Sequence, residues 1–478
     1  MVTKENFEVM KQFANQAVDS LNKAVCAFNF VEMAKEKLLQ SGFVQIYETD
    51  PWNFKPGDKL FYTRNNSCII AFTVGKEYND KTGCFKIIGA HTDSPSLRIA
   101  PKSYNPSEGL ERYNIQTYGG GLWFTWFDRD LSVAGKVVFK NDKGQLESAI
   151  IKCDEPIFVI PNLPPHLKND RLKLEWNNET QLKPLLATTL VSSLFQENKE
   201  VQKDKKLGPV LRTVILKELK KVTKANVKEE DIVDYDLCLY DTQPSKLIGL
   251  NGEFLASQRL DNQGSSVPAV FSIIEAAKDE VLAKQTSINI IALFDNEEIG
   301  SLTFQGADAN FFYTHLKRMY YQTAGKDAAA KTEDGFLAMC ARSFSLSADL
   351  AHAYNPNFAE KFQAQHRNLI QEGVVIKINA NGRYASDSEG GAIVKEIAKK
   401  CGCPIQEFIV RQDSPCGTTI GPIISSKIGI RSVDIGIPQF AMHSIREVLG
   451  ICDLYNYKNL FVEFFKSYEE AKGQLLKA

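Results

Sequence analysis

The sequence has little net charge, few histidines and no long apolar run. Its 57 basic and 58 acidic side chains leave a formal net charge of −1 over 478 residues, and it contains 6 histidines. Proteins that hold nucleic acid or anionic membranes by bulk charge need a strong basic excess, so we expect neither partner. The longest apolar runs, such as residues 288–294, have the length of a strand and are too short to cross a bilayer.

Signals for disulfides, secretion and several catalytic classes are also missing. The 10 cysteines are scattered with no C-x-x-C pair, which indicates free thiols in a reducing compartment. The N-terminus has no apolar core of the kind found in secretory signals. There is no H-E-x-x-H, no G-x-x-x-x-G-K-[ST] and no G-x-S-x-G motif. The sequence therefore lacks the usual motifs of helix zincins, P-loop nucleotide hydrolases and nucleophile-elbow hydrolases.

The chain itself has the composition of an ordinary globular protein, with 44% apolar and 24% charged residues. Its length predicts roughly two to three domains, or one large domain with an insertion. From about residue 237, buried-strand patterns such as 287–294 and 431–435 alternate with helical patterns. This alternation predicts an α/β fold with helices on both faces of the sheet. A middle region is richer in strand signals, at residues 115–118, 136–140, 148–152 and 157–160. It is followed by a lysine-rich stretch at 196–206, which is typical of a solvated surface loop.

The first candidate site residues follow a predicted strand at residues 85–88. His91 and Asp93, in GAHTDSPS, would reach the crevice at the carboxyl edge of a sheet, on the same side if the backbone stays extended. Asp93 would then hold the second ring nitrogen of His91 and fix its tautomer. A structural His–Asp pair explains this segment at least as well. Asp261, in SQRLDNQGSS, stands just before a helix, where Asp is also a common N-cap.

Two adjacent glutamates, Glu297 and Glu298, follow the apolar strand at 287–294 in ALFDNEEIGS. Buried carboxylates are costly unless they are paired or bind cations, so a solvated loop explains this segment less well than a site does. Neighbouring side chains in an extended or turning backbone point apart. One carboxylate can therefore bind a metal ion while the other acts as a general base on bound water.

Asp349, His352 and His443 extend the set of possible ligands. Asp349 and His352 stand three residues apart in SLSADLAHAYNP and would share a face on a turn of helix. His443 lies in AMHSIRE, after the strand and loop of VDIGIPQF. A lone histidine is usually structural. Two histidines and three carboxylates together can hold two zinc ions with one carboxylate shared, and Mn²⁺ or Co²⁺ suit the same ligands.

Seven segments, in their order along the chain, resemble the aspartyl aminopeptidase family of cytosolic dinuclear zinc exopeptidases. The segments are GAHTDSPS, YGGGLWFTWFDRDLSVAGKV, LDNQGSS, DNEEIGS, SADLAHAYNP, CGTTIGPI and AMHSIRE. The resemblance implies a mixed-sheet α/β catalytic domain formed by residues 1–96 and 241–478. It further implies a smaller β-rich dimerisation domain, residues 97–240, inserted after the first metal motif. A cytoplasmic homo-oligomer, a tetrahedral dodecamer, is implied as well.

The resemblance also assigns roles within the site. The positions that match the zinc ligands are His91, Asp261, Glu298, Asp349 and His443. Asp261 matches the carboxylate that bridges the two ions. Glu297 matches the general base, and Asp93 matches the residue behind His91.

Four more residues match positions that hold the substrate, a peptide with an N-terminal Asp or Glu. They are His166, His352, Lys377 and Tyr384. Lys377 is the candidate for binding the acidic side chain, because a lysine buried beside a carboxylate ligand avoids an unpaired ion. His166 matches a family histidine that reaches a neighbouring subunit's active site. Asn162 stands where a further histidine is common, so an exposed loop histidine stays an alternative for His166.

Two other functions stay open at this point. Relatives of the yeast vacuolar aminopeptidase share the fold but prefer neutral residues and carry an N-terminal propeptide. The residues before His91 read as domain helices and strands, which leaves little room for such a propeptide. A non-enzymatic scaffold on an inactive peptidase fold is the second alternative. Such proteins usually lose a ligand or the base, and every expected position is filled here.

Overall fold

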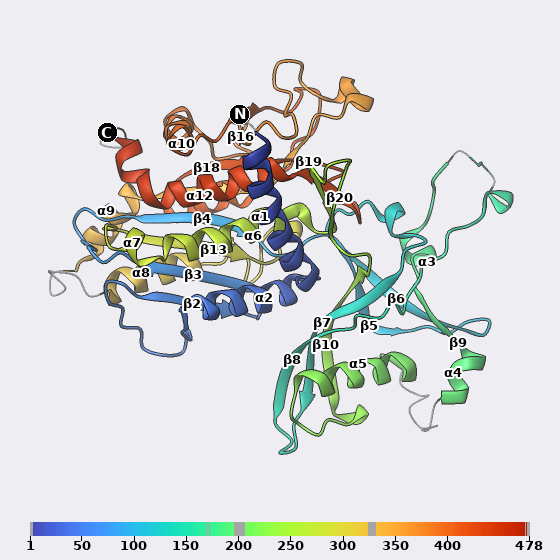
Figure 1. Ribbon diagram of the computed structural model, residues 1–478. Coiled ribbons are helices and arrows are strands. Elements are labelled where there is room, and N and C mark those ends of the chain that lie inside the picture. The colour runs from blue at the N-terminus through green and yellow to red at the C-terminus, as the bar shows by residue number, and fades with distance from the viewer. Residues whose placement is uncertain are drawn as a thin grey trace.

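The computed structural model describes residues 3–168, 170–171, 173–195, 206–323, 331–473 and 475. Most of the lysine-rich stretch at 196–206 lies outside the described residues. The described chain forms two lobes of unequal size (Figure 1). The larger lobe contains both the N-terminal and the C-terminal helices, and the smaller lobe is formed by the middle of the chain (Figure 1).

A nine-stranded sheet forms the centre of the larger lobe. Across the sheet its strands are β1 (Val44–Gln45), β2 (Lys59–Arg64), β3 (Cys68–Val74), β13 (Ile288–Phe294), β4 (Phe85–His91), β14 (Phe344–Ala348), β18 (Arg431–Gly436), β16 (Val374–Lys377) and β17 (Ile405–Phe408). The four central strands β13, β4, β14 and β18 run parallel to one another. Parallel strands end at one edge of a sheet, so the loops after these four strands meet there.

Helices cover both faces of this sheet, which explains why its central strands are buried along almost their whole length. Alternate side chains of β13 enter different cores, because successive residues of a strand point to opposite faces. Ile291 and Leu293 join one core, and Ile290 and Phe294 join the other. The first core is formed with α1 (Lys4–Lys23), α2 (Ala27–Gln40), α6 (Leu260–Ala276), α10 (Ser388–Cys401) and α12 (Ile451–Lys472). The second is formed with α8 (Phe311–Gln322), α9 (Glu333–Arg342) and α11 (Ile420–Ile428). The predicted α/β class is confirmed.

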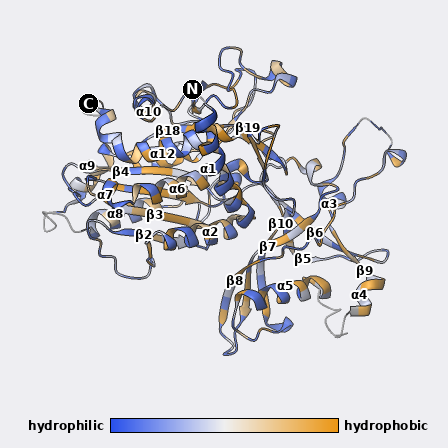
Figure 2. Cartoon of the chain, viewed as in Figure 1, coloured by the Kyte–Doolittle hydropathy of each residue, from blue (hydrophilic) through white to orange (hydrophobic). Residues whose placement is uncertain are grey.

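The smaller lobe has its own six-stranded antiparallel sheet and its own core. Its strands, in spatial order, are β8 (Leu146–Lys152), β7 (Leu131–Lys140), β10 (Ile232–Asp241), β5 (Ser96–Tyr104), β6 (Leu110–Tyr118) and β9 (Leu185–Thr188). Its helices are α3 (Asn178–Gln181), α4 (Thr189–Phe195) and α5 (Gly208–Val222). Apolar residues of α5 pack into the core with the sheet, and orange and blue alternate along these elements in Figure 2.

A third sheet of five strands completes the larger lobe. Its order is β11 (Lys246–Ile248), β12 (Phe254–Ser257), β20 (Glu447–Gly450), β19 (Pro438–Phe440) and β15 (Ala351–His352). The remaining short elements are α7 (Asp279–Leu282), η1 (Trp123–Trp126), η2 (Pro165–Leu167), η4 (Glu229–Asp231), η5 (Glu297–Ile299) and η7 (Pro356–Lys361). Strands β19 and β20 lie on the side of the larger lobe that faces the smaller one (Figure 1).

Two local expectations are wrong. Asp349 and His352 do not share a helical turn, because β15 pairs with β19 and keeps this segment extended. Residues 157–160 form only isolated bridges, through Phe158 and Val159, rather than a strand. Prolines at both ends of that segment remove backbone donors and limit further pairing.

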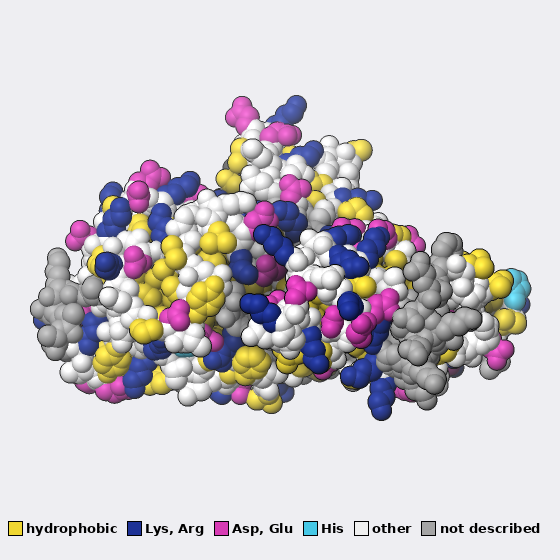
Figure 3. Space-filling view, turned by 90° about the horizontal axis from the view of Figure 1, so that it is seen from below, with side chains coloured by type: hydrophobic (Ala, Val, Ile, Leu, Met, Phe, Trp, Pro, Cys, Tyr) yellow, Lys and Arg dark blue, Asp and Glu magenta, His cyan; other side chains and the backbone are white. Residues whose placement is uncertain are grey.

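The surface agrees with the near-zero net charge. Basic and acidic side chains are interspersed on the face shown in Figure 3. No helix among the described residues is long and apolar enough to cross a membrane. All ten cysteines are free thiols, as their spacing predicted.

Candidate metal centre

The edge where the central strands end carries most of the site. His91 is the last residue of β4 and stands opposite Phe294 of β13 in the register. Glu297 and Glu298 follow β13 in the short helix η5. Asp349 comes directly after β14. The shared edge therefore brings together side chains that are far apart in the sequence.

Asp261 and His443 reach the same place from two other segments. Asp261 lies in the first turn of α6, where its backbone and that of Asn262 are not helical and the peptide bond between them is cis. The expected N-cap role is not seen, because Arg259 occupies that position. His443 lies in the loop between β19 and β20 with a left-handed φ of 67°.

The two oxygens of Asp261 face two different histidines. Oδ1 lies 3.6 Å from Nε2 of His91, and Oδ2 lies 3.2 Å from Nε2 of His443. Each histidine has a further carboxylate beside the same nitrogen. Asp349 Oδ1 lies 4.0 Å from His91 Nε2, and Glu298 Oε1 lies 3.4 Å from His443 Nε2. Asp261 thus joins two groups of one imidazole and one carboxylate each.

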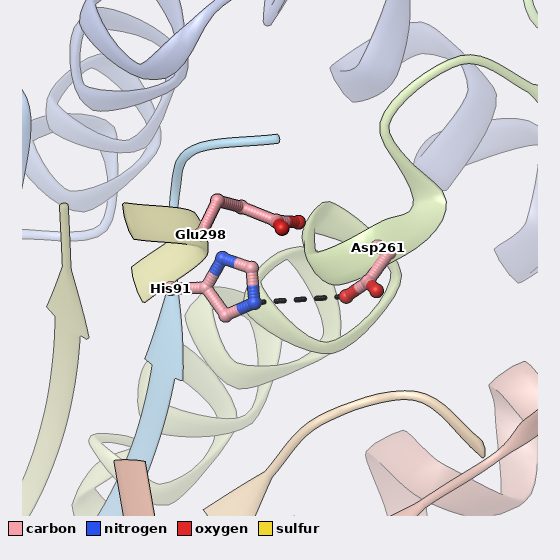
Figure 4. A group of neighbouring side chains, drawn as sticks. All are labelled: His91, Asp261 and Glu298. Carbon is pink, nitrogen blue, oxygen red and sulfur yellow. Dashed lines mark ion pairs between the residues drawn. The ribbon is translucent and has the colours of Figure 1, made fainter. Parts of the chain in front are cut away.

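This donor set fits two zinc ions. With zinc–ligand bonds of about 2.0–2.2 Å, two ligand atoms of a tetrahedral ion stand about 3.3–3.6 Å apart. Three of the separations found here are close to that range, and the fourth, from Asp349 Oδ1 to His91 Nε2, is longer at 4.0 Å. Asp261 Oδ1 and Glu298 Oε1 are buried and have no hydrogen-bond partner among the residues that the structure describes. Buried oxygens of this kind are costly unless they bind a cation. Figure 4 shows Asp261, Glu298 and His91 directed into one space.

Hydrogen bonds orient both imidazoles for metal binding. His91 Nδ1 lies 3.0 Å from the backbone oxygen of Asp93 and 3.3 Å from its Oδ1. His443 Nδ1 lies 2.9 Å from the backbone oxygen of Gly120. These acceptors suit a proton on Nδ1, so Nε2 is the ring nitrogen of each histidine that faces the shared space and would bind a cation in place of its own proton. The position of Asp93 agrees with the orienting role expected for it.

The site holds more buried acidic groups than the imidazoles can neutralise. Burial raises the pKa of Glu297 to about 8, against the attraction of His91 and helped by the repulsion of Asp349. Burial also raises the pKa of Asp349 to about 6, although Lys377 opposes the shift. Burial alone would lower the pKa of His443, but Asp261 and Glu298 outweigh it and raise the pKa to about 10. Such an excess of carboxylates favours the binding of divalent cations.

Three of the four predicted substrate residues lie beside Asp349. The Lys377 ammonium is buried, 3.4 Å from Asp349 Oδ2 and 5.4 Å from the centre of the Tyr384 ring. Desolvation by the surrounding protein and the charge of Lys377 both lower the pKa of His352, which is consistent with a neutral imidazole close to the lysine. His352 is exposed and lines a cavity of about 270 Å³ with Met442, the neighbour of His443.

His166 is the exception among the predicted site residues. It lies exposed in η2 of the smaller lobe and, among the described residues, makes no hydrogen bond or ion pair with the group around Asp261. A role in a neighbouring subunit therefore stays a prediction.

The sequence analysis did not identify Glu447, whose side chain holds the backbone of two site residues in place. Its buried carboxylate accepts hydrogen bonds from the backbone nitrogens of His443, at 2.8 Å, and Asp261, at 3.2 Å. The signal was available, because Glu447 is an acidic residue at the start of a strand whose other residues are apolar or glycine.

A third group of potential metal ligands lies in the smaller lobe and is explained by ion pairs. It consists of Cys153, Glu155 and Glu218. Lys217 pairs with Glu155 at 2.9 Å, and Lys221 pairs with Glu218 at 2.8 Å. These lysines neutralise the carboxylates without a metal ion.

Comparisons with known proteins agree with this geometry. The family described as Aminopeptidase I zinc metalloprotease (M18) matches residues 20–465. An aspartyl aminopeptidase of Aspergillus oryzae is 40% identical, over 98% of each chain. Among solved structures, the complex of Ape4 and Nbr1 matches with a TM-score of 0.93 and 34% identity, over 98% of this chain and 88% of the other. The S. cerevisiae mApe1 dodecamer matches with a TM-score of 0.82 and 29% identity, over 97% and 99% of the two chains. The family resemblance seen in the sequence is confirmed.

Proposed function

The chain belongs to the M18 family of zinc metalloproteases and is a metalloaminopeptidase, and from this premise we propose that it removes an N-terminal Asp, or Glu, from peptides. One observation carries the proposal. Asp261 joins two histidine–carboxylate groups, and the Lys377 ammonium stands 3.4 Å from Asp349 at the side of one of them. A cation held at that position suits a substrate whose first side chain is a carboxylate.

We assign the zinc ligands from the same contacts. His91 and Asp349 would hold one zinc ion with Asp261 Oδ1, and His443 and Glu298 would hold the second with Asp261 Oδ2. When bound, two such ions lower the pKa of a water between them and polarise the scissile carbonyl. Mn²⁺ or Co²⁺ suit the same oxygen and nitrogen ligands.

Glu297 is the proposed general base. Its Oε2 lies 3.8 Å from Nε2 of His91 in one group with Asp349, and the family resemblance gives it the role of base rather than ligand. Burial raises the pKa of the Glu297 carboxyl, whereas cations bound beside it would lower this pKa and favour the carboxylate that a base requires. The carboxylate accepts a proton from the attacking water and then donates it to the nitrogen of the leaving peptide.

Lys377 is the proposed specificity residue. The ammonium is only 4% exposed, and Asp349 supplies the one carboxylate with which it makes an ion pair among the described residues. An N-terminal Asp or Glu side chain would bring a second carboxylate to this cation, whereas a leucine side chain would desolvate it without compensation. His352 and Tyr384, beside Lys377, would bind the substrate backbone.

The proposal extends to assembly and location. We expect a tetrahedral homododecamer whose contacts involve the smaller lobe, residues 97–240, with His166 reaching the active site of a neighbouring subunit. The absence of a strong basic excess supports peptides, rather than nucleic acid or membranes, as partners. Free cysteines throughout support a cytoplasmic location.

A substrate panel tests the proposed specificity. Rates with Asp-, Glu- and Leu-anilides should be measured on zinc-restored wild-type protein and on Lys377→Met. We expect the wild type to cleave the Asp and Glu substrates faster than the Leu substrate, and Lys377→Met to lose most of this preference while it keeps its zinc. Faster cleavage of Leu than of Asp by the wild type would contradict the acidic preference and favour a neutral aminopeptidase.

A further inference from the structure

A segment of the smaller lobe lies against the metal centre of the larger lobe. It consists of Tyr118, the last residue of β6, and the glycines that follow it, Gly119 and Gly120. The Tyr118 side chain is 6% exposed, and the Arg98 guanidinium lies 3.6 Å from the centre of its ring. The tyrosine is therefore held firmly by its own lobe at the boundary between the two lobes.

The Tyr118 hydroxyl ends a hydrogen-bond network that starts at the metal centre. It donates to Asp93 Oδ2 at 2.6 Å and accepts from Asn296 Nδ2 at 2.8 Å. A tyrosine hydroxyl is a donor at neutral pH, so it matches the carboxylate of Asp93. Through these two bonds the smaller lobe contacts residues next to His91 and Glu297.

The Asp93 carboxylate, which binds Tyr118, also contacts three functional residues. Its Oδ1 accepts from the backbone nitrogen of Glu297, and its Oδ2 accepts from that of Glu298, both at 3.2 Å. The same side chain lies 3.3 Å from Nδ1 of His91. One carboxylate thus orients the proposed base and one ligand of each proposed zinc ion.

The glycines contact the other half of the centre. The backbone oxygen of Gly120 lies 2.9 Å from Nδ1 of His443, and the nitrogen of Leu122 donates to the backbone oxygen of His443 at 3.0 Å. Gly119 has a φ of 73°, and a Cβ atom there would stand 3.2 Å from Cβ of Glu298. A side chain at Gly119 would therefore press on a ligand, so this approach requires glycine.

We propose that residues 118–120 of the smaller lobe are positioning residues for both zinc sites. The inference rests on the proposed function, since it assumes that His91, Glu298 and His443 bind zinc. Tyr118 acts through Asp93 on one histidine and on the Glu297–Glu298 backbone, and Gly120 acts directly on the other histidine. The inserted lobe is then a structural part of the metal centre, because it supplies hydrogen-bond partners that fix the ligands. Partners of this kind typically contribute about 10- to 100-fold to metal affinity.

The test is the zinc affinity of the holoenzyme, measured by competition with a chelator at fixed pH. Tyr118→Phe removes only the hydroxyl, and we expect it to raise the zinc Kd about tenfold or more. Tyr113→Phe is the matched control, because Tyr113 lies on the same strand, is fully buried and belongs to the core of the smaller lobe. It should leave the Kd unchanged.

A second pair of variants tests the glycine contact independently. Gly119→Ala places a methyl group against Glu298 and should also weaken zinc binding. Gly109→Ala is its control, because Gly109 lies in the same lobe with a φ of 75° and has no atom within 4 Å of the added Cβ. Both alanines carry the same backbone strain, so only the contact with Glu298 differs.

The outcomes separate this inference from the proposed function. A wild-type protein that binds fewer than two zinc ions per chain would overturn both. If the wild type binds two ions and Tyr118→Phe binds them equally tightly, the positioning role is wrong and the proposed function stands. A lower unfolding temperature with an unchanged zinc Kd would likewise overturn the positioning role, since it would show a purely structural tyrosine.

Discussion

At the scale of single residues, neighbouring carboxylates in the site have different partners. Glu298 faces His443 Nε2 at 3.4 Å and shares that nitrogen with Asp261. Glu297 lies 3.8 Å from His91 Nε2 and belongs to neither proposed ligand group. Glu298 groups with His91 and Asp261, and Glu297 groups with His91 and Asp349, so consecutive positions can have different roles.

This difference predicts opposite phenotypes for two otherwise identical substitutions. Glu297→Gln should keep its zinc and lower kcat by about 10²- to 10⁴-fold, because only the proton acceptor is lost. Glu298→Gln should lose zinc from one site. Metal content and kcat of the two purified variants provide the check. Full activity of Glu297→Gln would show that this residue is not the base, and unchanged zinc in Glu298→Gln would show that it is not a ligand.

The residue scale is also where the sequence predicted most of the site, and the reason is chemical. Acidic and histidine residues that follow apolar strands are rare without a function, and the order of the motifs resembled a known family. Glu447 and Tyr118 were missed because they act through hydrogen bonds to backbone or to Asp93. Tyr118 gives no spacing signal, and the partners of both residues are known only once the fold is known.

At the scale of elements, the parallel strands carry the ligands, so their close packing matters for metal binding. Gly436 ends β18, where a Cβ atom would stand only 2.1 Å from the backbone oxygen of Asp349. Any side chain at this position must displace the loop that carries the ligand.

Gly436→Ala should therefore lower both stability and zinc content. Overpacking of this kind costs about 1–3 kcal/mol of unfolding free energy. Gly391→Ala, in α10, is the control, because its added Cβ meets no atom within 4 Å and alanine favours a helix. Urea unfolding of the holoenzyme, with zinc analysis, compares the two. Equal behaviour of the two variants would show that the Asp349 loop tolerates displacement.

A buried lysine connects the strand that carries His91 to the C-terminal helix. Lys86 of β4 is fully buried, lies 3.1 Å from Glu469 of α12 and also donates to Gln285. Removing only its ionic partner would leave a buried charge uncompensated.

We expect Glu469→Gln to lower the unfolding free energy by about 2–3 kcal/mol, somewhat less than the roughly 3–5 kcal/mol for a fully buried pair, because Glu469 is partly exposed. The double variant Lys86→Met, Glu469→Leu should recover most of that loss, because it removes both charges. Urea unfolding of the three proteins tests this. A double variant less stable than Glu469→Gln would show that the pair itself stabilises the fold.

Strands were predicted correctly from the sequence where burial of the whole strand determined its residues. The strands at 85–88 and 287–294 are buried on both faces, so a mostly apolar sequence identified each of them. The segment from Asp349 to His352 was read as helical because three-residue spacing suits a helix, but pairing of β15 with β19 decides its conformation. Such pairing joins distant parts of the chain, so local spacing does not reveal it.

At the scale of the whole molecule, the smaller lobe carries exposed apolar side chains that suit an interface. Leu190 and Leu194 of α4 are 78% and 73% exposed. Leu250, in the larger lobe, is 95% exposed but lies in a turn outside the smaller lobe. Exposed apolar patches of this kind mark interaction sites.

We expect sedimentation velocity to show an assembly of twelve copies of the 53.5 kDa chain. The double variant Leu190→Glu, Leu194→Glu should give smaller species, because charge enters the proposed contact surface. Leu250→Glu should keep the wild-type mass. A wild-type mass for both proteins would show that α4 takes no part in assembly.

The central claim is that Asp261 is shared by two metal ions. Diffraction from zinc-loaded crystals, recorded at the zinc absorption edge, locates the ions directly. We expect two anomalous peaks about 3.5–4 Å apart, one beside Asp261 Oδ1 with His91 and the other beside Oδ2 with His443. A single peak, or two peaks that do not both contact Asp261, would contradict the claim.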